Sequence, residues 1–351
     1  MDVTHRQFRL FILLACAGLS SLCAAQSTPF GKGVFRYAPY GHSLLADEHP
    51  YFVRFDAGWQ TNHPEWDWGQ TGKAMRVSTF GVFGINLPLW RGDIRSEQYA
   101  LSVTWPVSAT IWLDLGEPVT APVVNQDWRI SLPVCTFLHR LNRGFVQNYS
   151  VTFAPFKHES THIGDELVLQ HTDQGYPLRR VNVSYNYSEY VFTLNDPENF
   201  REQAHTFRAG LMLLWNWKKG WYFIHETDGD ATLAQPRLSP WEAYLQYQYQ
   251  SSVSKHGFQG VASIEIRNRA LYGYPVFTWD AQTKTLKSEP QQETRVFTYN
   301  VFAGVRYCNP LYDGYFSRVA VGIRAYHGNT PYGQFRNHRN YNHIGVCLVF
   351  E

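Results

Sequence analysis

Long apolar runs are missing from this sequence after its first 25 residues. A membrane-spanning helix needs about 18 or more consecutive apolar residues, and no later segment reaches that length. Cysteine is scarce as well, with three thiols beyond residue 25, at Cys135, Cys308 and Cys347. Three thiols allow at most one disulfide bridge, and their spacing fits no cysteine-based metal site. Any membrane insertion must therefore use strands, and whether two of the cysteines pair stays open.

Charge of either sign is also low, at 17% of the 351 residues, and it is nearly balanced. The chain has 31 Lys and Arg against 29 Asp and Glu, and 29 against 28 remain without Arg6, Arg9 and Asp2 of the N-terminal segment. This balance argues against nucleic acid as a partner, because such binding requires clustered positive charge. No Pro/Gly/Ser-rich linker, charge block or short repeat divides the chain, so we expect a single domain.

The N-terminus has the pattern of a secretory signal peptide. Arg6 and Arg9 precede an apolar run over residues 10–22, and small residues follow at the positions that a signal peptidase reads, so we expect Gln26 to begin the mature chain. A lipoprotein signal at Cys16 is the alternative, with a shorter apolar core. The expected parts are a signal peptide, an N-terminal periplasmic segment and a transmembrane β-barrel, over residues 1–25, 26–50 and 51–351.

Residues 99–115 carry the strongest structural signal, because every second side chain there is apolar. Successive side chains of a strand point to opposite faces, so this pattern predicts one long strand with a wholly apolar face. The same alternation predicts strands that begin near Tyr51, Ala74, Tyr99, Trp128, Phe145, Val181, Phe207, Trp241, Phe258, Val296, Val319 and Asn340. Together with 16% aromatic residues and the export signal, it predicts an all-β fold, a single closed antiparallel barrel of about twelve strands in a Gram-negative outer membrane.

Charged residues follow the polar phase of these segments. An arginine on the lipid face near the midplane costs about 2–4 kcal/mol, so a spanning barrel keeps its charges inside. Charges of both signs facing inward predict a hydrogen-bonded, largely filled lumen in place of an open channel. The expected inward residues are Arg54, Arg76, Arg129, Arg208, Arg267, Arg306 and Arg324, together with Asp56, Asp114, Glu242 and Glu265.

The last segment alternates up to Phe350, one residue before the end of the sequence. In bacterial barrels a terminal aromatic residue is read by the barrel-assembly machinery. We therefore expect this machinery and outer-membrane lipids to be the partners. Glu351 departs from the usual pattern, in which the aromatic residue comes last.

The densest chemical cluster is residues 157–166, which contain the pattern H-E-x-x-H. A zinc protease places this motif on a helix, where both histidines reach one metal ion. Here the motif ends an extended run just after Pro155, so we interpret the match as accidental. On a strand, His158, Ser160 and His162 share one face. They continue the polar phase of the preceding residues, which predicts that they face the lumen.

A His and a Ser two residues apart resemble the catalytic pair of the outer-membrane phospholipase, a twelve-stranded barrel, although the Asn-Gly element of that enzyme is absent here. In a hydrolase, His158 would be the base and Ser160 the nucleophile. Asp165 or Glu166 would orient the imidazole or, with His158 and His162, hold a divalent cation. Only under this hydrolase alternative is any cofactor expected. A polar junction at the barrel rim is the structural interpretation of the same residues.

Four short segments, in their order and spacing, cover nearly all of the expected mature chain. They are residues 45–47, 160–166, 180–185 and 331–335, the last comprising Pro331, Tyr332, Gly333, Gln334 and Phe335. These segments resemble the bacterial outer-membrane barrels catalogued as domain-of-unknown-function family 1207. The resemblance implies an outer-membrane barrel and brings no established activity or catalytic residues. Within it, we expect Tyr332 and Phe335 to be membrane-interface anchors and Gly333 to form a turn.

The sequence favours a surface or structural barrel without enzymatic activity. A lipid-modifying hydrolase, of phospholipase or lipid A deacylase type, is the first alternative, and a small-solute channel or transporter is the second. The direction in which the His158 cluster points distinguishes them. A cluster inside the lumen disfavours lipid chemistry, whereas a cluster open to the outer leaflet favours it. A continuous water-filled lumen would indicate transport.

Overall fold

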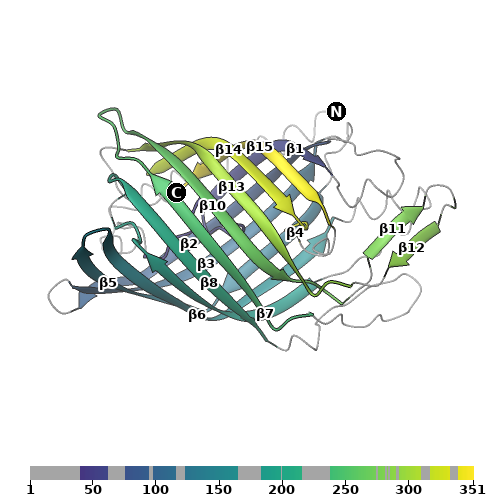
Figure 1. The fold of residues 1–351 in the computed structure, drawn as a ribbon, viewed down its shortest axis with the longest axis horizontal. Helices are drawn as coiled ribbons and strands as arrows, with labels where there is room; N and C mark the ends of the chain where they lie inside the picture. The colour runs from purple at the N-terminus through teal and green to yellow at the C-terminus, as the bar shows by residue number, and fades with distance from the viewer. Residues whose placement is uncertain are drawn as a thin grey trace, which may run out of the picture.

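Twelve antiparallel strand positions close on themselves into a barrel (Figure 1). The computed structural model describes residues 40–61, 76–94, 98–115, 123–164, 183–198, 200–215, 238–273, 276–280, 283, 285–289, 292–309, 317–332 and 339–351. Its strands are β1 (Val53–Thr61), β2 (Arg76–Ile94), β3 (Tyr99–Asp114), β4 (Val123–Ser131), β5 (Val134–Arg143), β6 (Val146–Ile163), β7 (Val183–Leu194), β8 (Ala204–Leu214), β9 (Trp241–Gln250), β10 (Phe258–Ala270), β11 (Val276–Asp280), β12 (Thr285–Glu289), β13 (Arg295–Cys308), β14 (Arg318–Gly328) and β15 (Tyr341–Phe350). None of the described residues forms a helix long and apolar enough to cross a membrane.

The register between the first and last strands closes the ring. β1 pairs with β2 on one side and with β15 on the other, where Val53 lies opposite Phe350. β4 and β5 share one position in the wall, because both lie between β3 and β6 and are separated only by Leu132 and Pro133. The predicted twelve-stranded antiparallel barrel is therefore confirmed, and each predicted segment supplies one position.

The two faces of the wall are opposite in character. Large apolar side chains are exposed on every barrel strand, whereas the charges predicted to face inward are buried wherever the structure describes their side chains. The side chain of Arg76, in β2, is not among them. Soluble proteins rarely expose so much apolar surface, and this arrangement is that of a barrel surrounded by lipid. Exposed examples are Phe55, Trp105, Leu245, Val305 and Val346.

Connections at the two ends of the barrel differ in length. Two residues, Gly144 and Phe145, separate β5 from β6 at the end where β1 begins. At the opposite end, residues 164–182 separate β6 from β7 and residues 215–240 separate β8 from β9. Transmembrane barrels have short periplasmic turns and longer extracellular loops. By this rule, β6 ends on the extracellular side.

A separate hairpin, formed by β11 and β12, lies in the connection between β10 and β13. It stands away from the wall in Figure 1. None of the predicted segments covers this hairpin, because two five-residue strands carry too short an alternation to stand out from a loop.

A bulge at Pro155 and Phe156 interrupts the alternation along β6. These two residues lie opposite a single residue of β7, Ser188. Proline has no N–H to donate to the ladder. Neighbouring groups satisfy the bulge carbonyls instead: the Ser188 hydroxyl donates to Pro155 (2.7 Å), and the Leu132 N–H donates to Phe156 (3.0 Å). One extra residue exchanges the faces on which odd- and even-numbered residues lie. The side chains of residues 157–162 therefore point opposite to the direction that unbroken alternation predicts.

Glu351 extends the ladder of β15 by one residue. Its N–H donates to the Arg318 carbonyl (2.9 Å), and its carboxylate lies 3.0 Å from Arg306 Nε inside the barrel. Both arginines are buried. This acidic residue after Phe350 is therefore accommodated by two inward cations.

Candidate functional sites

Residues 40–52, here called the plug, run through the lumen before the chain enters β1. Leu45 and Ala46 are fully buried in it. Ala46 donates its N–H to Ser263 of β10 (3.2 Å) and accepts at its carbonyl from Asn300 of β13 (2.7 Å). Buried backbone groups require such partners. The described part of the segment that we expected in the periplasm thus lies inside the barrel, held by the polar side chains of the wall.

A tight turn leads the chain into the plug. Gly41 has a φ of 70° and donates its N–H to Asp196 (2.8 Å). A Cβ at this position would lie 2.7 Å from the Thr152 hydroxyl, so glycine is required. Next to it, burial and the positive charge of Arg208 hold the pKa of His42 well below its ordinary range. Burial raises the pKa of Asp196, which lies 3.7 Å from His42.

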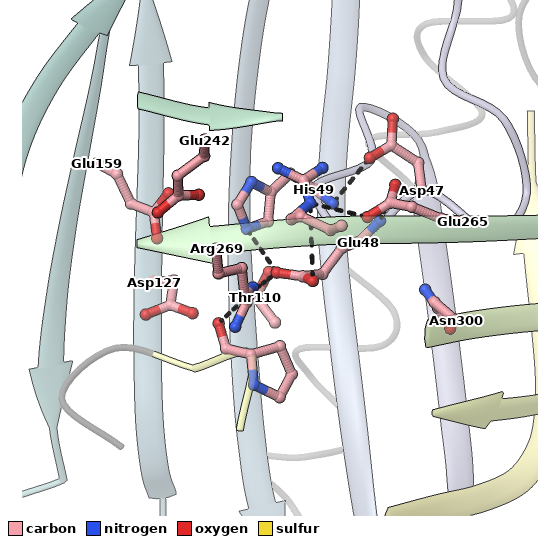
Figure 2. Close-up of polar contacts among 12 residues, drawn as sticks. Asp47, Glu48, His49, Thr110, Asp127, Glu159, Glu242, Glu265, Arg269 and Asn300 are labelled. Atoms are coloured by element: carbon pink, nitrogen blue, oxygen red, sulfur yellow. Dashed lines mark hydrogen bonds and ion pairs between the residues drawn. The ribbon is translucent and has the colours of Figure 1, made fainter. Parts of the chain in front are cut away.

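An ion-pair network joins the plug to β10 (Figure 2). Glu48 pairs with Arg269, and its carboxylate lies 3.0 Å from Nε2 of the adjacent His49 and 3.8 Å from Nε of Arg267. Arg267 also pairs with Glu265 at 2.8 Å. All of these groups are buried. A buried charge that loses its partner is strongly destabilising, so the network fixes the plug against the wall.

Aromatic side chains cluster inside the barrel at the end where β14 finishes. Tyr332 follows β14, stacks on Phe80 (centroids 4.9 Å apart) and lies 5.0 Å from the ring of Trp112. The carbonyl of Thr330 accepts from Arg269 (3.0 Å). Tyr332 therefore points into the lumen and not to the membrane interface where we expected it, because the residues after β14 turn inward over the barrel mouth. Outside the described residues lie Gly333, Gln334 and Phe335.

Side chains of the plug and of the wall together line a cavity in the lumen. The cavity has a volume of about 50 Å³, and the ion pair of Lys157 with Glu189 lines it. This volume admits a few water molecules. The plug and inward charges of both signs line this part of the lumen, and a largely filled lumen stays a prediction. Other charged groups that line the cavity are Asp47, His49, Arg208 and Arg267.

The His158 cluster lies on the outer face of the barrel and not in the lumen, which corrects the sequence-based expectation. His158 and Ser160 are half-buried and His162 is exposed, whereas Glu159 between them is buried inside. The cause is the extra residue at Pro155 and its neighbour, which reverses the phase of β6.

Tryptophan side chains mark the level of this cluster. Trp128 of β4 lies opposite Ser160 and is 50% exposed, and Trp215 at the end of β8 is 44% exposed. Tryptophan is enriched at the boundary between the lipid and water. The cluster therefore lies at the extracellular interface, beside the apolar band.

Each histidine of the cluster contacts a different serine. His158 Nδ1 lies 2.7 Å from the Asn186 side-chain oxygen, and its Nε2 lies 3.4 Å from the Ser184 hydroxyl. The Ser160 hydroxyl lies 3.3 Å from Nε2 of His162. The partner of His158 is thus Ser184 of β7, directly across from Ser160. Sequence reasoning missed Ser184 and Asn186, because nothing along the chain gives the register between β6 and β7.

The geometry separates the residues of the H-E-x-x-H pattern. Glu159 accepts from the Tyr185 hydroxyl (2.6 Å) and from Arg129 Nε (3.3 Å) inside the barrel. It therefore cannot act together with the two outward histidines. Asp165 and Glu166 lie outside the described residues. Within the described residues, no group of three or more His, Cys, Asp or Glu is arranged to hold a metal ion.

The three cysteines beyond residue 25 are free thiols in this structure. Cys308 and Cys347 are buried, and Cys135 is exposed on the outer face.

Several solved structures are similar to this chain, all at low identity. Pseudomonas aeruginosa OccK10 (OpdN) shares 7% identity, over 85% of this chain and 98% of that chain, with a TM-score of 0.23. A mutant of TodX, described as a monoaromatic hydrocarbon channel, shares 9% over 91% and 96%, with a TM-score of 0.29. Salmonella typhi OmpF in complex with daunomycin shares 8% over 85% and 96%, with a TM-score of 0.26. No family model and no curated protein matches the chain, so the resemblance to family 1207 stays a prediction.

Proposed function

We propose that this protein is an outer-membrane barrel that is closed to solutes and acts at its extracellular surface. The outward apolar face supports insertion in the membrane, and the unequal connections at the two ends support an orientation in which the longer connections are extracellular. The observation that carries the proposal is the plug, which occupies the lumen and bonds to β10 and β13. It favours a surface or structural barrel over a small-solute channel.

Ion pairs and buried apolar residues oppose release of the plug. Moving it out would separate Glu48 from Arg267 and Arg269 and would expose the fully buried Leu45. Separating a buried ion pair costs on the order of a few kcal/mol, and exposing a leucine costs about 1.5–3 kcal/mol. The closed state is therefore the stable one.

Conductance across a planar lipid bilayer tests this proposal. We expect the folded full-length protein to show no steady conductance, whereas a variant lacking residues 41–49 conducts. Glu48→Gln keeps the size of the side chain and removes the ion pair, so it should give brief openings more often than the wild type. Steady conductance of the wild type, or equal silence of the wild type and both assembled variants, contradicts the proposal.

A further inference from the structure

The outer face of β6 and β7 carries polar side chains that the closed lumen does not require. Ser160, Ser184 and Asn186 lie there and are half-buried. The outward positions of the same strands nearer the membrane centre are apolar, as at Phe153 and Phe192. None of the three contributes to the inward ion-pair network. They are free to serve a function at the membrane surface.

We propose that Ser184, His158 and Asn186 form a serine hydrolase site that cleaves acyl esters of lipids in the outer leaflet, and that Ser160 lies beside this site without taking part in it. Ser184 is the nucleophile, His158 is the general base, and Asn186 is the positioning residue. The inference goes beyond the closed barrel and does not depend on it, because the site lies on the opposite face of the wall from the plug.

Hydrogen bonding fixes how His158 uses its two nitrogens. The side-chain oxygen of Asn186 can only accept a hydrogen bond, so Nδ1 of His158 carries the proton that it donates over 2.7 Å. Nε2 then presents its lone pair to the Ser184 hydroxyl at 3.4 Å. A nucleophile, a base and a group that orients the base form the arrangement that activates a serine, and the first contact is often looser before a substrate binds.

The backbone N–H of Ser184 lies on the β8 side of β7. The Trp215 N–H donates to the Asn186 carbonyl (2.8 Å) on that side. Residues two apart in a strand present their N–H groups to the same side, so the N–H of Ser184 also points toward β8. Within the proposed site, this N–H is the donor for the negative charge that develops on the ester carbonyl oxygen.

The surroundings of the cluster select an amphipathic ester. Ile130 lies opposite His158 and is 47% exposed, which offers apolar contact for an acyl chain. Trp128 and Trp215 place the serine at the interface, where a lipid carries its ester bonds between headgroup and chain. Glycerophospholipids and acylated saccharide lipids share this chemistry.

Each step of the reaction balances with water as the second reactant. Ser184 Oγ bonds to the ester carbonyl carbon while its proton passes to His158 Nε2. The carbon–oxygen bond to the lipid alcohol then breaks, and the alcohol takes that proton. Water attacks the acyl-serine, His158 again accepts and returns the proton, and the fatty acid leaves. Ser184 and neutral His158 are restored.

Fatty-acid release from mixed micelles tests the site, with phosphatidylethanolamine in one arm and purified lipid A in the other. The full-length protein should release fatty acid in at least one arm, which identifies the lipid source. Ser184→Ala should reduce release by about 100-fold or more. Ser160→Ala is the matched control, since it removes the facing hydroxyl, and should keep release within about threefold. A fluorophosphonate probe should label Ser184, as located by mass spectrometry.

Heat-modifiable migration on electrophoresis verifies that each variant is folded. Lack of release in both arms by the folded wild type overturns the proposal. Release by Ser184→Ala equal to that of the wild type also overturns it. Loss of release in Ser160→Ala alone would identify Ser160, and not Ser184, as the nucleophile. Bilayer conductance is expected to stay the same in all of these variants, so failure of this proposal is distinguishable from failure of the closed barrel.

Asn186 is tested as a positioning residue. Asn186→Leu should lower kcat more than it raises KM, because it frees the imidazole to rotate. Asn186→Asp keeps an acceptor for Nδ1 and should restore part of the rate and shift the pH profile upward by stabilising the charged imidazole. Equal loss in both variants, with an unchanged pH profile, would contradict this role.

Discussion

The two faces of the extracellular half of β6 and β7 use polar residues in opposite ways. Inside, the carboxylate of Glu159 is buried and bonded to Arg129 and Tyr185. Outside, His158 precedes Glu159 in the sequence and Ser184 precedes Tyr185. His158 and Ser184 are half-buried, and a single long contact of 3.4 Å links their side chains. The inner polar groups are satisfied because the fold cannot leave them unpaired. The outer groups have no such obligation, and this makes them candidates for chemistry.

Removing an inner charge should break this contrast most clearly. Glu159→Leu leaves the buried guanidinium of Arg129 with the neutral Thr110 hydroxyl, at 3.1 Å, and the more distant carboxylate of Asp127, at 3.5 Å. We expect a loss of about 3–5 kcal/mol in the free energy of unfolding, because a buried charge is left poorly paired. The outer counterpart His158→Leu should cost less than about 1 kcal/mol. Urea unfolding in micelles, followed by tryptophan fluorescence, measures both. Similar losses would mean that the faces are not distinct.

Depth in the membrane should matter on the outer face alone. Val107 lies at the middle of β3 on the apolar side, whereas Ser160 lies at the interface. Val107→Arg should cost about 2–4 kcal/mol, and Ser160→Arg should cost about 0–1 kcal/mol. Assembly yield and unfolding in lipid vesicles compare the two variants. Equal tolerance would show that the lipid face has been assigned incorrectly.

Loss of one inner hydrogen bond should have a smaller effect. Tyr185→Phe removes the hydroxyl that donates to Glu159 over 2.6 Å. Hydrogen bonds to charged groups contribute about 1.5–3 kcal/mol, so we expect a loss in this range. The same unfolding experiment measures it. No change in the free energy of unfolding would show that the hydrogen bonds of Glu159 contribute less to stability than the burial of its carboxylate implies.

The smallest expected effect is the pH dependence of the plug. Burial holds the pKa of His42 below its ordinary value of about 6.5. An unfolded chain takes up a proton on this histidine near pH 6.5 and the folded chain does so only at lower pH, so stability should decrease as the pH falls below about 6.5. The limit is about 1.4 kcal/mol per pH unit.

His42→Asn should remove that loss between pH 6.5 and 5.5. Asp196, whose pKa burial raises, is present in both proteins, so their difference reports the histidine together with its interaction with Asp196, 3.7 Å away. Identical pH profiles of unfolding for wild type and variant would contradict the assignment.

Most of the wall was predictable from the sequence. Alternation with period two depends only on the geometry of a strand, and it located every strand position and the inward charges. It failed beyond Pro155, because a bulge changes the phase without changing the composition of the strand. Proline inside a strand pattern was the local signal for this irregularity.

The plug and the outer site were less predictable. Leu45 and Ala46 lie in no alternating segment, and only contacts more than 200 residues away in sequence place them in the lumen. In the sequence, Tyr332 does not differ from an aromatic residue in any loop. Its contact with Phe80, which only the structure gives, places it in the lumen. Pairing of His158 with Ser184 depends on register across a long connection, which the order of residues does not specify.

A spin-label scan along β6, one position at a time from Tyr149 to His162, measures whether the bulge at Pro155 and Phe156 turns His158 and Ser160 to the outer face. Collisions with oxygen, which concentrates in lipid, report which side chains face outward. We expect high values at residues 149, 151 and 153, then a change of phase at 155–156, and high values at 158, 160 and 162. An unbroken alternation that makes residues 157, 159 and 161 accessible would place His158 in the lumen and contradict both the bulge and the outer site.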